Sequence, residues 1–281
     1  MHGIIVVDKE YGVTSRDVVN EIEHIFKTKK VGHTGTLDPI ATGVLVITIG
    51  KYTKLNELLT STYKEYVATM KLGVTTDTFD TEGKVLTENK IEVSKEEIIN
   101  TISSFKGEYD QEVPIYSSVK VKGKKLYEYA RENVDVELPK RMVDIKEIEV
   151  LSINNDIVVF KTLVSKGTYI RSLINDIGTS LGCGAIMTSL RRTKQGIFSI
   201  ENAYKLEDIK NGNYKFEDVI KSLNLTTFEV DDYLLNKINN GSIIENRYNV
   251  NEIIFTKDNE MIAIYKKYDK DKTKMKPWKM F

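Results

Sequence analysis

Apolar residues recur along this chain with the periods of both strands and helices. Two short aliphatic runs, 4–7 and 44–49, predict buried strands. Between them, residues 15–26 place apolar side chains at helical spacing, which indicates an amphipathic helix capped by Ser15. The combination predicts a protein of the mixed α/β class.

Further elements follow from the same patterns. They are an alternating strand from Tyr66 to Leu72, a helix that opens with a Ser94–Glu97 capping box and ends at Gly107, paired strands at 142–151 and 157–164, and a helix after Thr168. Residues 108–140 are polar, tyrosine-rich and poorly periodic, as expected of a surface insertion. Short strands after residue 226 predict a second unit at 227–281. Its core would be too small to be stable alone, so we expect it to pack against the rest of the chain.

Composition narrows the class of protein. The 281 residues are 41% hydrophobic and 29% charged, which is ordinary for a globular protein. The single cysteine, Cys183, cannot form an intramolecular disulfide, and the early apolar run is too short for a signal peptide or membrane helix. We therefore expect a cytoplasmic protein without a membrane partner. Three histidines and one cysteine leave little for a metal site, and we expect none.

The charges balance, with 41 basic and 41 acidic residues, so any nucleic-acid binding must depend on local patches. Basic runs occur at 27–30, 120–125, 191–194 and 266–279. Each run alone is more typical of a solvated face. The run at 120–125 lies among Tyr116, Tyr127 and Tyr129, a mixture of cations and aromatic rings that suits an unstacked RNA loop.

The best candidate for chemistry is Asp38, in the glycine-rich segment 32–43. Three glycines and a proline fix an irregular backbone there, and a buried strand follows. A carboxylate on a stiff loop beside a core strand is well placed to act as a nucleophile or general base. A tight turn that carries a surface Asp is the alternative for such a loop.

The segment 32–43 resembles the catalytic loop of the bacterial tRNA pseudouridine-55 synthases, the TruB family. Further family motifs occur along the chain in the order typical of the family, at 8–15, 64–66, 72–73, 76–80, 114–120, 127–131, 165–171 and 190–198. Glu10 and Val113 stand where the family usually has proline. The resemblance implies an α/β (α+β) fold with a mixed, largely antiparallel sheet at 1–226. It also implies an RNA-clasping insertion within that domain and a C-terminal PUA-type RNA-binding domain at 227–281.

The resemblance assigns roles to individual residues. Asp38 is the nucleophile, Arg171 is the cation paired with it, and Tyr66 stacks on the target base and accepts its C5 proton. It implies that the remaining pocket residues are His33, Lys54, Asp80, Tyr169 and Leu190, and that the RNA is clasped by Lys120, Lys124, Tyr127 and Arg131. Isomerisation involves no net redox change, so we expect no cofactor.

The predicted function is isomerisation of uridine 55 in the tRNA T-loop, with the tail binding the acceptor stem. Paired carboxylates also suit a nucleosidase-type hydrolase, which would release free uracil. A non-catalytic tRNA-folding chaperone is a further alternative, and its function would survive loss of Asp38. A guide-RNA-dependent enzyme of the dyskerin group would share the loop, but the predicted insertion favours an enzyme without guide RNA.

Overall fold

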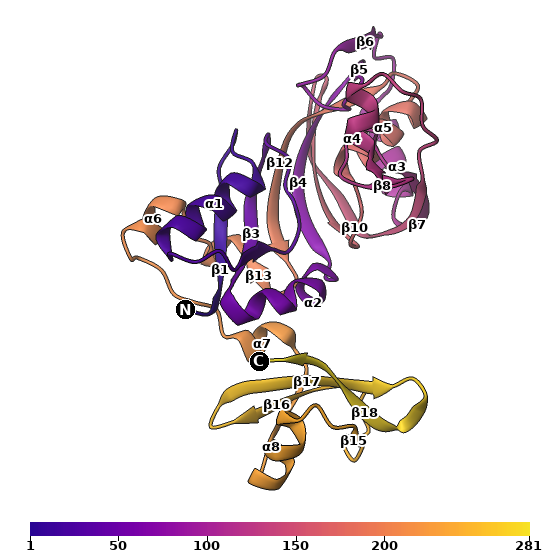
Figure 1. The fold of residues 1–281 in the computed structure, drawn as a ribbon. Coiled ribbons are helices and arrows are strands. Elements are labelled where there is room, and N and C mark those ends of the chain that lie inside the picture. The colour runs from indigo at the N-terminus through magenta and orange to yellow at the C-terminus, as the bar shows by residue number, and fades with distance from the viewer.

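A nine-stranded mixed sheet organises the larger part of the molecule in this computed structural model, which describes residues 1–281 (Figure 1). Its strands are β1 (Gly3–Lys9), β2 (Val31–His33), β3 (Ala41–Ile49), β4 (Lys64–Leu72), β7 (Gly107–Glu112), β10 (Lys140–Asn154), β11 (Ile157–Val164), β12 (Ala185–Gln195) and β13 (Phe198–Ser199). The main path is β1-β3-β12-β4-β11-β10-β7, and every pairing is antiparallel except β3 with β12. The predicted mixed, largely antiparallel sheet is confirmed.

Helices cover the sheet in two groups. Helices α1 (Ser15–Ile25) and α6 (Leu206–Lys210) pack at the β1–β2 end, and α3 (Lys95–Ser104) and α5 (Ile170–Ser180) pack over the other half of the sheet. The core between these layers is a cluster of 30 buried residues. No helix combines the length and apolar character needed to cross a bilayer. Short connecting elements complete this part: η1 (Gly50–Leu55), α2 (Asn56–Thr60), the hairpin β5 (Val74–Thr76) and β6 (Val85–Glu88), η2 (Ile200–Asn202) and α7 (Val219–Leu223).

Two predicted helix boundaries were wrong. Thr14, and not Ser15, caps α1, because the Thr14 side chain accepts the Asp17 N–H while Asp17 reaches back to the Thr14 N–H. The Ser94–Glu97 capping box of α3 is confirmed, but that helix ends at Ser104. Gly107 begins strand β7 instead, where its φ of 111° suits a residue without a Cβ.

The insertion predicted at 108–140 begins later than expected. Strand β7 pairs with β10 at one edge of the sheet, so residues 108–112 belong to the sheet. An edge strand with a largely exposed face shows little apolar alternation, which explains why the sequence pattern missed it. The rest is a surface segment with a small hairpin, β8 (Lys120–Val121) and β9 (Lys124–Lys125), and one helix, α4 (Leu126–Arg131).

The C-terminal part is rich in strands and lies below the large sheet in Figure 1. Its sheet has the order β14-β16-β17-β18-β15, and its elements are β14 (Thr226–Glu229), α8 (Asp232–Asn239), β15 (Ile244–Glu245), β16 (Glu252–Lys257), β17 (Glu260–Tyr268) and β18 (Asp271–Met280). It has a small core of 8 buried residues. A second cluster joins Ile254, Met261 and Ile264 to residues of β1 and β3, so this part packs against the large sheet.

The packing at Gly43 yields a stability prediction. Gly43 lies in β3 between Lys9 of β1 and Arg192 of β12, with φ of 99°. A Cβ at this position would lie 2.2 Å from the carbonyl oxygen of Arg192. We expect Gly43→Ala to lower the free energy of unfolding by more than about 3 kcal/mol in chemical denaturation.

Gly12→Ala is the matched control. Gly12 also has a positive φ, of 80°, but nothing lies within 4 Å of the place where its Cβ would be. Its substitution carries only backbone strain, about 1 kcal/mol. Equal destabilisation by the two substitutions would show that the close approach of β3 and β12 does not require glycine.

Candidate active site

The loop that connects β2 to β3, residues 34–40, is held by buried polar side chains from outside it. The Ser15 hydroxyl donates to the carbonyl of Leu37 (3.1 Å) and accepts its N–H (2.9 Å). The Lys9 ammonium donates to the carbonyl of Pro39 (3.2 Å) and to two carbonyls of its own segment. Burial lowers the pKa of Lys9 to about 8, while the negative charge of Asp38 acts in the opposite direction.

Strand β12 supplies the other anchors of this loop. Arg192 donates from Nη2 to the carbonyl of Gly35 (3.0 Å) and from Nε to the carbonyl of Val44 (2.6 Å). Gln195 donates to the carbonyl of Thr34 (2.9 Å). These side chains mainly bind backbone carbonyls of the loop. The loop is therefore rigid at the position where it presents Asp38.

Asp38 and Arg171 form a two-point ion pair. Nε of Arg171 lies 2.9 Å from Oδ2 of Asp38, and Nη2 lies 3.3 Å from Oδ1. The Asp38 side chain is 38% exposed, whereas that of Arg171 is 7% exposed. The guanidinium is thus buried behind a carboxylate that remains accessible, and it holds that carboxylate in one orientation through two hydrogen bonds.

The same guanidinium contacts two other segments. It donates to the carbonyls of Thr78 (2.9 Å) and Tyr116 (3.0 Å), and its Nε lies 3.7 Å from Oδ2 of the buried Asp80. Arg171 thereby joins the Asp38 loop, the turn after β5 and the insertion. Asp80 was expected near the base edge, but it lies behind Arg171 and does not line the pocket.

A buried amide positions the start of helix α5. The side-chain oxygen of Gln111 accepts the N–H of Tyr169 (2.7 Å), and its nitrogen donates to the Tyr169 carbonyl (3.1 Å). Gln111 is 1% exposed and comes from the edge strand β7. This clamp fixes the backbone immediately before the turn that carries Arg171.

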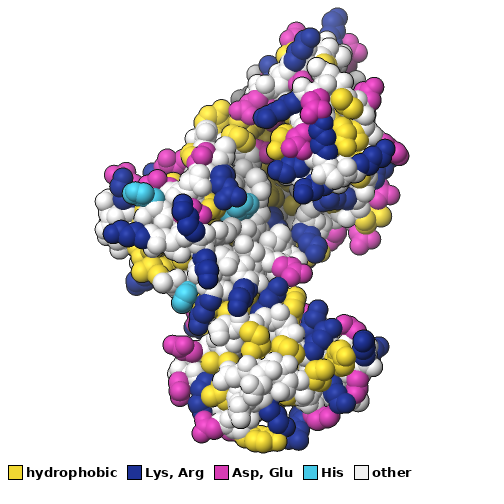
Figure 2. Space-filling model, in the orientation of Figure 1, with side chains coloured by type: hydrophobic (Ala, Val, Ile, Leu, Met, Phe, Trp, Pro, Cys, Tyr) yellow, Lys and Arg dark blue, Asp and Glu magenta, His cyan; other side chains and the backbone are white.

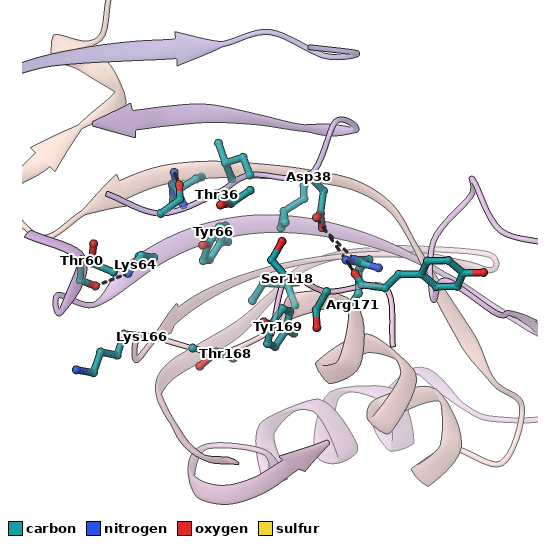
Figure 3. Close-up of a pocket in the computed structure, with 18 of the residues that line it drawn as sticks. Thr36, Asp38, Thr60, Lys64, Tyr66, Ser118, Lys166, Thr168, Tyr169 and Arg171 are labelled. Atoms are coloured by element: carbon teal, nitrogen blue, oxygen red, sulfur yellow. Dashed lines mark hydrogen bonds and ion pairs between the residues drawn. The ribbon is translucent and has the colours of Figure 1, made fainter. Parts of the chain in front are cut away.

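These elements surround a pocket of about 450 Å³ (Figure 3). Tyr66 projects from β4 between the Asp38–Arg171 pair and Lys64, and Tyr169 and Ser118 face it from the other side. The full lining is Gly35, Thr36, Leu37, Asp38, Thr60, Lys64, Tyr66, Tyr116, Ser117, Ser118, Tyr127, Lys166, Gly167, Thr168, Tyr169, Ile170, Arg171, Leu190 and Arg192. Of the predicted site residues, the lining includes Asp38, Tyr66, Tyr127, Tyr169, Arg171 and Leu190.

Two other predicted pocket residues lie outside the lining. Lys54 was wrongly placed there: its ammonium donates to the carbonyl of Met280 (2.6 Å), because η1 faces the C-terminal strand. His33 lies at the end of β2, where its Nδ1 accepts the Gly35 N–H (3.3 Å). Burial lowers the pKa of His33, which favours its neutral imidazole.

The basic run at 191–194 is divided between the surface and the core, because Arg191 and Lys194 are accessible and Arg192 is buried. Arg191 forms an ion pair with Asp8 (2.9 Å), and Arg192 is 1% exposed. Successive side chains along β12 point to opposite faces of the sheet, so the number of basic residues in the run does not show how many of them are exposed. The run within the insertion does lie at the surface, where Arg131 and Lys125 stack on Tyr127, Lys124 pairs with Glu132, and Lys120 is exposed.

Several site residues were missed by the sequence prediction. Lys9, Ser15, Gln195 and Arg192 anchor the loop, and Gln111 clamps Tyr169. Strand alternation could have found Lys9, because it shares one face of β1 with the buried Ile5 and Val7. The structure contains no group of three or more His, Cys, Asp or Glu side chains arranged to hold a metal ion.

Comparisons with known proteins identify the family of the chain. The model of the "TruB family pseudouridylate synthase (N terminal domain)" matches residues 23–170, and that of the "tRNA pseudouridylate synthase B C-terminal domain" matches 171–235. The chain belongs to the TruB family. The resemblance expected from the sequence is confirmed, and the protein is an RNA isomerase of the tRNA pseudouridine synthase class.

Relatives in the TruB family match along nearly the whole chain. tRNA pseudouridine synthase B of Clostridium tetani is 46% identical over 94% of this chain and 92% of its own length. The protein of that name from Lactobacillus acidophilus is 40% identical over 96% of both chains. Among solved structures, a chain of a Cbf5–Nop10–Gar1 complex superposes with a TM-score of 0.70 at 29% identity, covering 94% of this chain and 78% of that one.

Anchoring of the loop by Ser15 leads to a prediction. Ser15→Ala leaves the buried N–H and carbonyl of Leu37 without their partner. We expect a loss of about 1–3 kcal/mol in the free energy of unfolding, together with lower isomerase activity. Ser103→Ala is the control, because that hydroxyl is exposed and makes no hydrogen bond. Unchanged stability and activity of the Ser15 variant would show that the loop holds its shape without this anchor.

Proposed function

We propose that this TruB-family enzyme converts uridine 55 of the tRNA T-loop into pseudouridine, with Asp38 as the nucleophile. The observation that carries the proposal is the accessible Asp38 carboxylate backed by the buried guanidinium of Arg171. The pocket of about 450 Å³ in front of it is large enough to receive a flipped nucleotide. The relatives named tRNA pseudouridine synthase B support tRNA as the substrate.

The reaction breaks the N1–C1′ bond, rotates the uracil and forms a C5–C1′ bond. The proton on C5 is lost and N1 gains one, so the mass of the nucleotide does not change. Asp38 attacks either the sugar or the base ring, and its ionised form is required in both cases. Arg171 serves this step because it stabilises the carboxylate through two parallel hydrogen bonds.

Aromatic and apolar side chains would hold the uracil while it turns. Tyr66, Tyr169 and Leu190 line the pocket around the position in front of Asp38. In our proposal the Tyr66 ring stacks on the base and its hydroxyl accepts the C5 proton. His33, neutral and adjacent to the loop, would fill the space that the flipped nucleotide leaves in the RNA.

The insertion would clasp the T-loop. Tyr127 lines the pocket and carries Lys125 and Arg131 over its ring, while Lys120 and Lys124 lie on the adjoining hairpin. Figure 2 shows that Lys and Arg side chains border the hollow of the large domain and continue to the near edge of the small one. Such a path suits an RNA backbone. We assign the 227–281 domain, as a PUA-type module, to the acceptor stem.

Asp38→Asn tests the chemistry. We expect tritium release from a tRNA transcript labelled at uridine C5 to fall below about one thousandth of the wild-type rate, with tRNA still bound. Arg171→Lys keeps the positive charge but loses the fork, and we expect a loss of about 100-fold. Both variants are compared with wild type for folding by circular dichroism.

The same assay separates the alternative functions. Free uracil as product would indicate a hydrolase, and tight binding without tritium release by wild type would indicate a chaperone. A requirement for an added RNA would indicate guide dependence. Release by the purified wild-type protein alone, without free uracil, is the outcome that we expect.

The acceptor-stem assignment has its own test. Deleting 227–281 would uncover the apolar cluster shared with β1 and β3, so charge reversal is preferable. Lys270→Glu with Lys272→Glu alters two exposed lysines beside the β17–β18 turn. We expect affinity for whole tRNA to fall about tenfold, while affinity for an isolated T-arm hairpin stays unchanged. The exposed pair Lys84→Glu with Lys90→Glu is the control, and equal losses for both RNAs would contradict the assignment.

A further inference from the structure

Two buried cations line the pocket away from the Asp38–Arg171 pair. Lys64 is 7% exposed and Arg192 is 1% exposed, and both contribute to the pocket wall. Figure 3 shows Lys64 beside Thr60, on the far side of Tyr66 from Asp38. Neither cation has a role in the proposed bond-breaking and bond-forming steps.

The hydrogen bonds of these cations leave donors available. Lys64 Nζ donates to the carbonyls of Thr60 (3.0 Å) and Thr62 (3.1 Å), which leaves its third proton without an acceptor. Arg192 uses Nε and Nη2 for backbone carbonyls, and its Nη1 has no hydrogen-bond partner. Neither side chain forms an ion pair with any carboxylate.

Both side chains border a space that Gly35 keeps open. A Cβ on Gly35 would lie 3.5 Å from Cε of Lys64 and 3.6 Å from Nη1 of Arg192. The amide oxygen of Gln195 lies 3.8 Å from the same point, but it is uncharged and neutralises neither cation. The side chains of the two cations therefore border the same small region beside Gly35, Arg192 with its Nη1 and Lys64 with the carbon that carries its ammonium.

Two desolvated cations without a counter-ion are costly in a folded protein. Burial lowers the pKa of Lys64 to about 8, and the positive charges of Arg192 and Lys166 act in the same direction. Binding of an anion would remove this penalty. A nucleotide that enters the pocket brings a phosphate on each side of its sugar, and such a phosphate is the natural counter-ion.

We propose that Lys64 and the Nη1 edge of Arg192 form a binding subsite for one phosphodiester of the substrate RNA, next to the nucleotide held at Asp38. The inference rests on the proposed function, because it takes the occupant of the pocket to be a flipped nucleotide. The subsite fixes the position of the sugar–phosphate chain while the base is free to rotate. Arg192 also anchors Gly35, so the same side chain links phosphate binding to the shape of the catalytic loop.

The test replaces single phosphates of a T-arm hairpin by uncharged methylphosphonates. With wild-type protein we expect one position at which the neutral linkage weakens binding about tenfold. Lys64→Gln should weaken binding of the natural hairpin by a similar factor, and the neutral linkage at that position should then cause no further loss. Lys90→Gln is the control, since this exposed lysine lies outside the pocket and should leave the effect of the linkage unchanged.

A measurement on wild type alone covers the case in which Lys64→Gln does not fold. Raising the pH from 7 to 8.5 discharges part of Lys64, so affinity for the natural hairpin should fall. The fall should be smaller for the hairpin with the neutral linkage at the sensitive position. Lys9 titrates in the same range, but it affects both hairpins equally and cancels from the comparison.

Several outcomes would overturn the proposal. One is a methylphosphonate series in which no position couples to Lys64, and another is an identical pH dependence for both hairpins. A third is stabilisation by inorganic phosphate that Lys64→Gln abolishes, without any coupled position in the RNA, which would indicate a site for a free anion. Tritium release by wild type is measured in parallel. If it is present while coupling is absent, only the subsite is wrong, and if it is absent, the proposed function is wrong.

Discussion

The site depends on one buried guanidinium. Arg171 comes from the first turn of α5 and contacts the Asp38 loop, the Thr78 carbonyl and the Tyr116 carbonyl. Asp80 lies on the same cation, so one positive charge serves two carboxylates, one buried and one accessible. Because its donors point in fixed directions, the guanidinium also sets the relative positions of three segments that are distant in the sequence.

Around the Asp38–Arg171 ion pair, polar side chains occupy buried positions that apolar side chains usually fill. Lys9, Ser15, Arg192 and Gln195 are all nearly inaccessible, and each binds backbone atoms of the loop or its flanks. Buried polar side chains stabilise a fold less than well-packed apolar ones, but they hold a backbone in one conformation. A carboxylate presented by such a loop does not have to be ordered when substrate arrives, which is an advantage for catalysis.

The cations also create an electrical asymmetry within the pocket. Asp38 and Asp80 share the charge of Arg171, whereas Lys64 and Arg192 on the other side of the pocket have no acidic partner. A ligand with a neutral base and a negatively charged backbone matches this distribution. The C-terminal part shares an apolar cluster with β1 and β3, so it is held in a defined orientation to the pocket. Both features suit recognition of a large, folded RNA.

The sequence determined the elements and the central residue of the site. Periodicity located the main strands and helices, and the segment 32–43 identified Asp38 through its glycines and its family resemblance. These signals are local, since each depends on a few neighbouring residues. The same local patterns missed β7, because the sequence of an edge strand resembles that of a loop. They also placed the helix cap at Ser15, because a serine in the first turn of a helix resembles a capping residue.

Only the tertiary structure decided which polar residues are buried and what they bind. In the sequence, Arg191 and Arg192 are equivalent neighbours, but strand alternation directs one to Asp8 and the other into the core. Lys54 was expected in the pocket, yet its ammonium binds the carbonyl of Met280 in the C-terminal strand and it lies outside the lining. Such outcomes depend on pairing across more than a hundred residues. The sequence therefore identified the candidate reactive group, and the fold determined the charges that surround it.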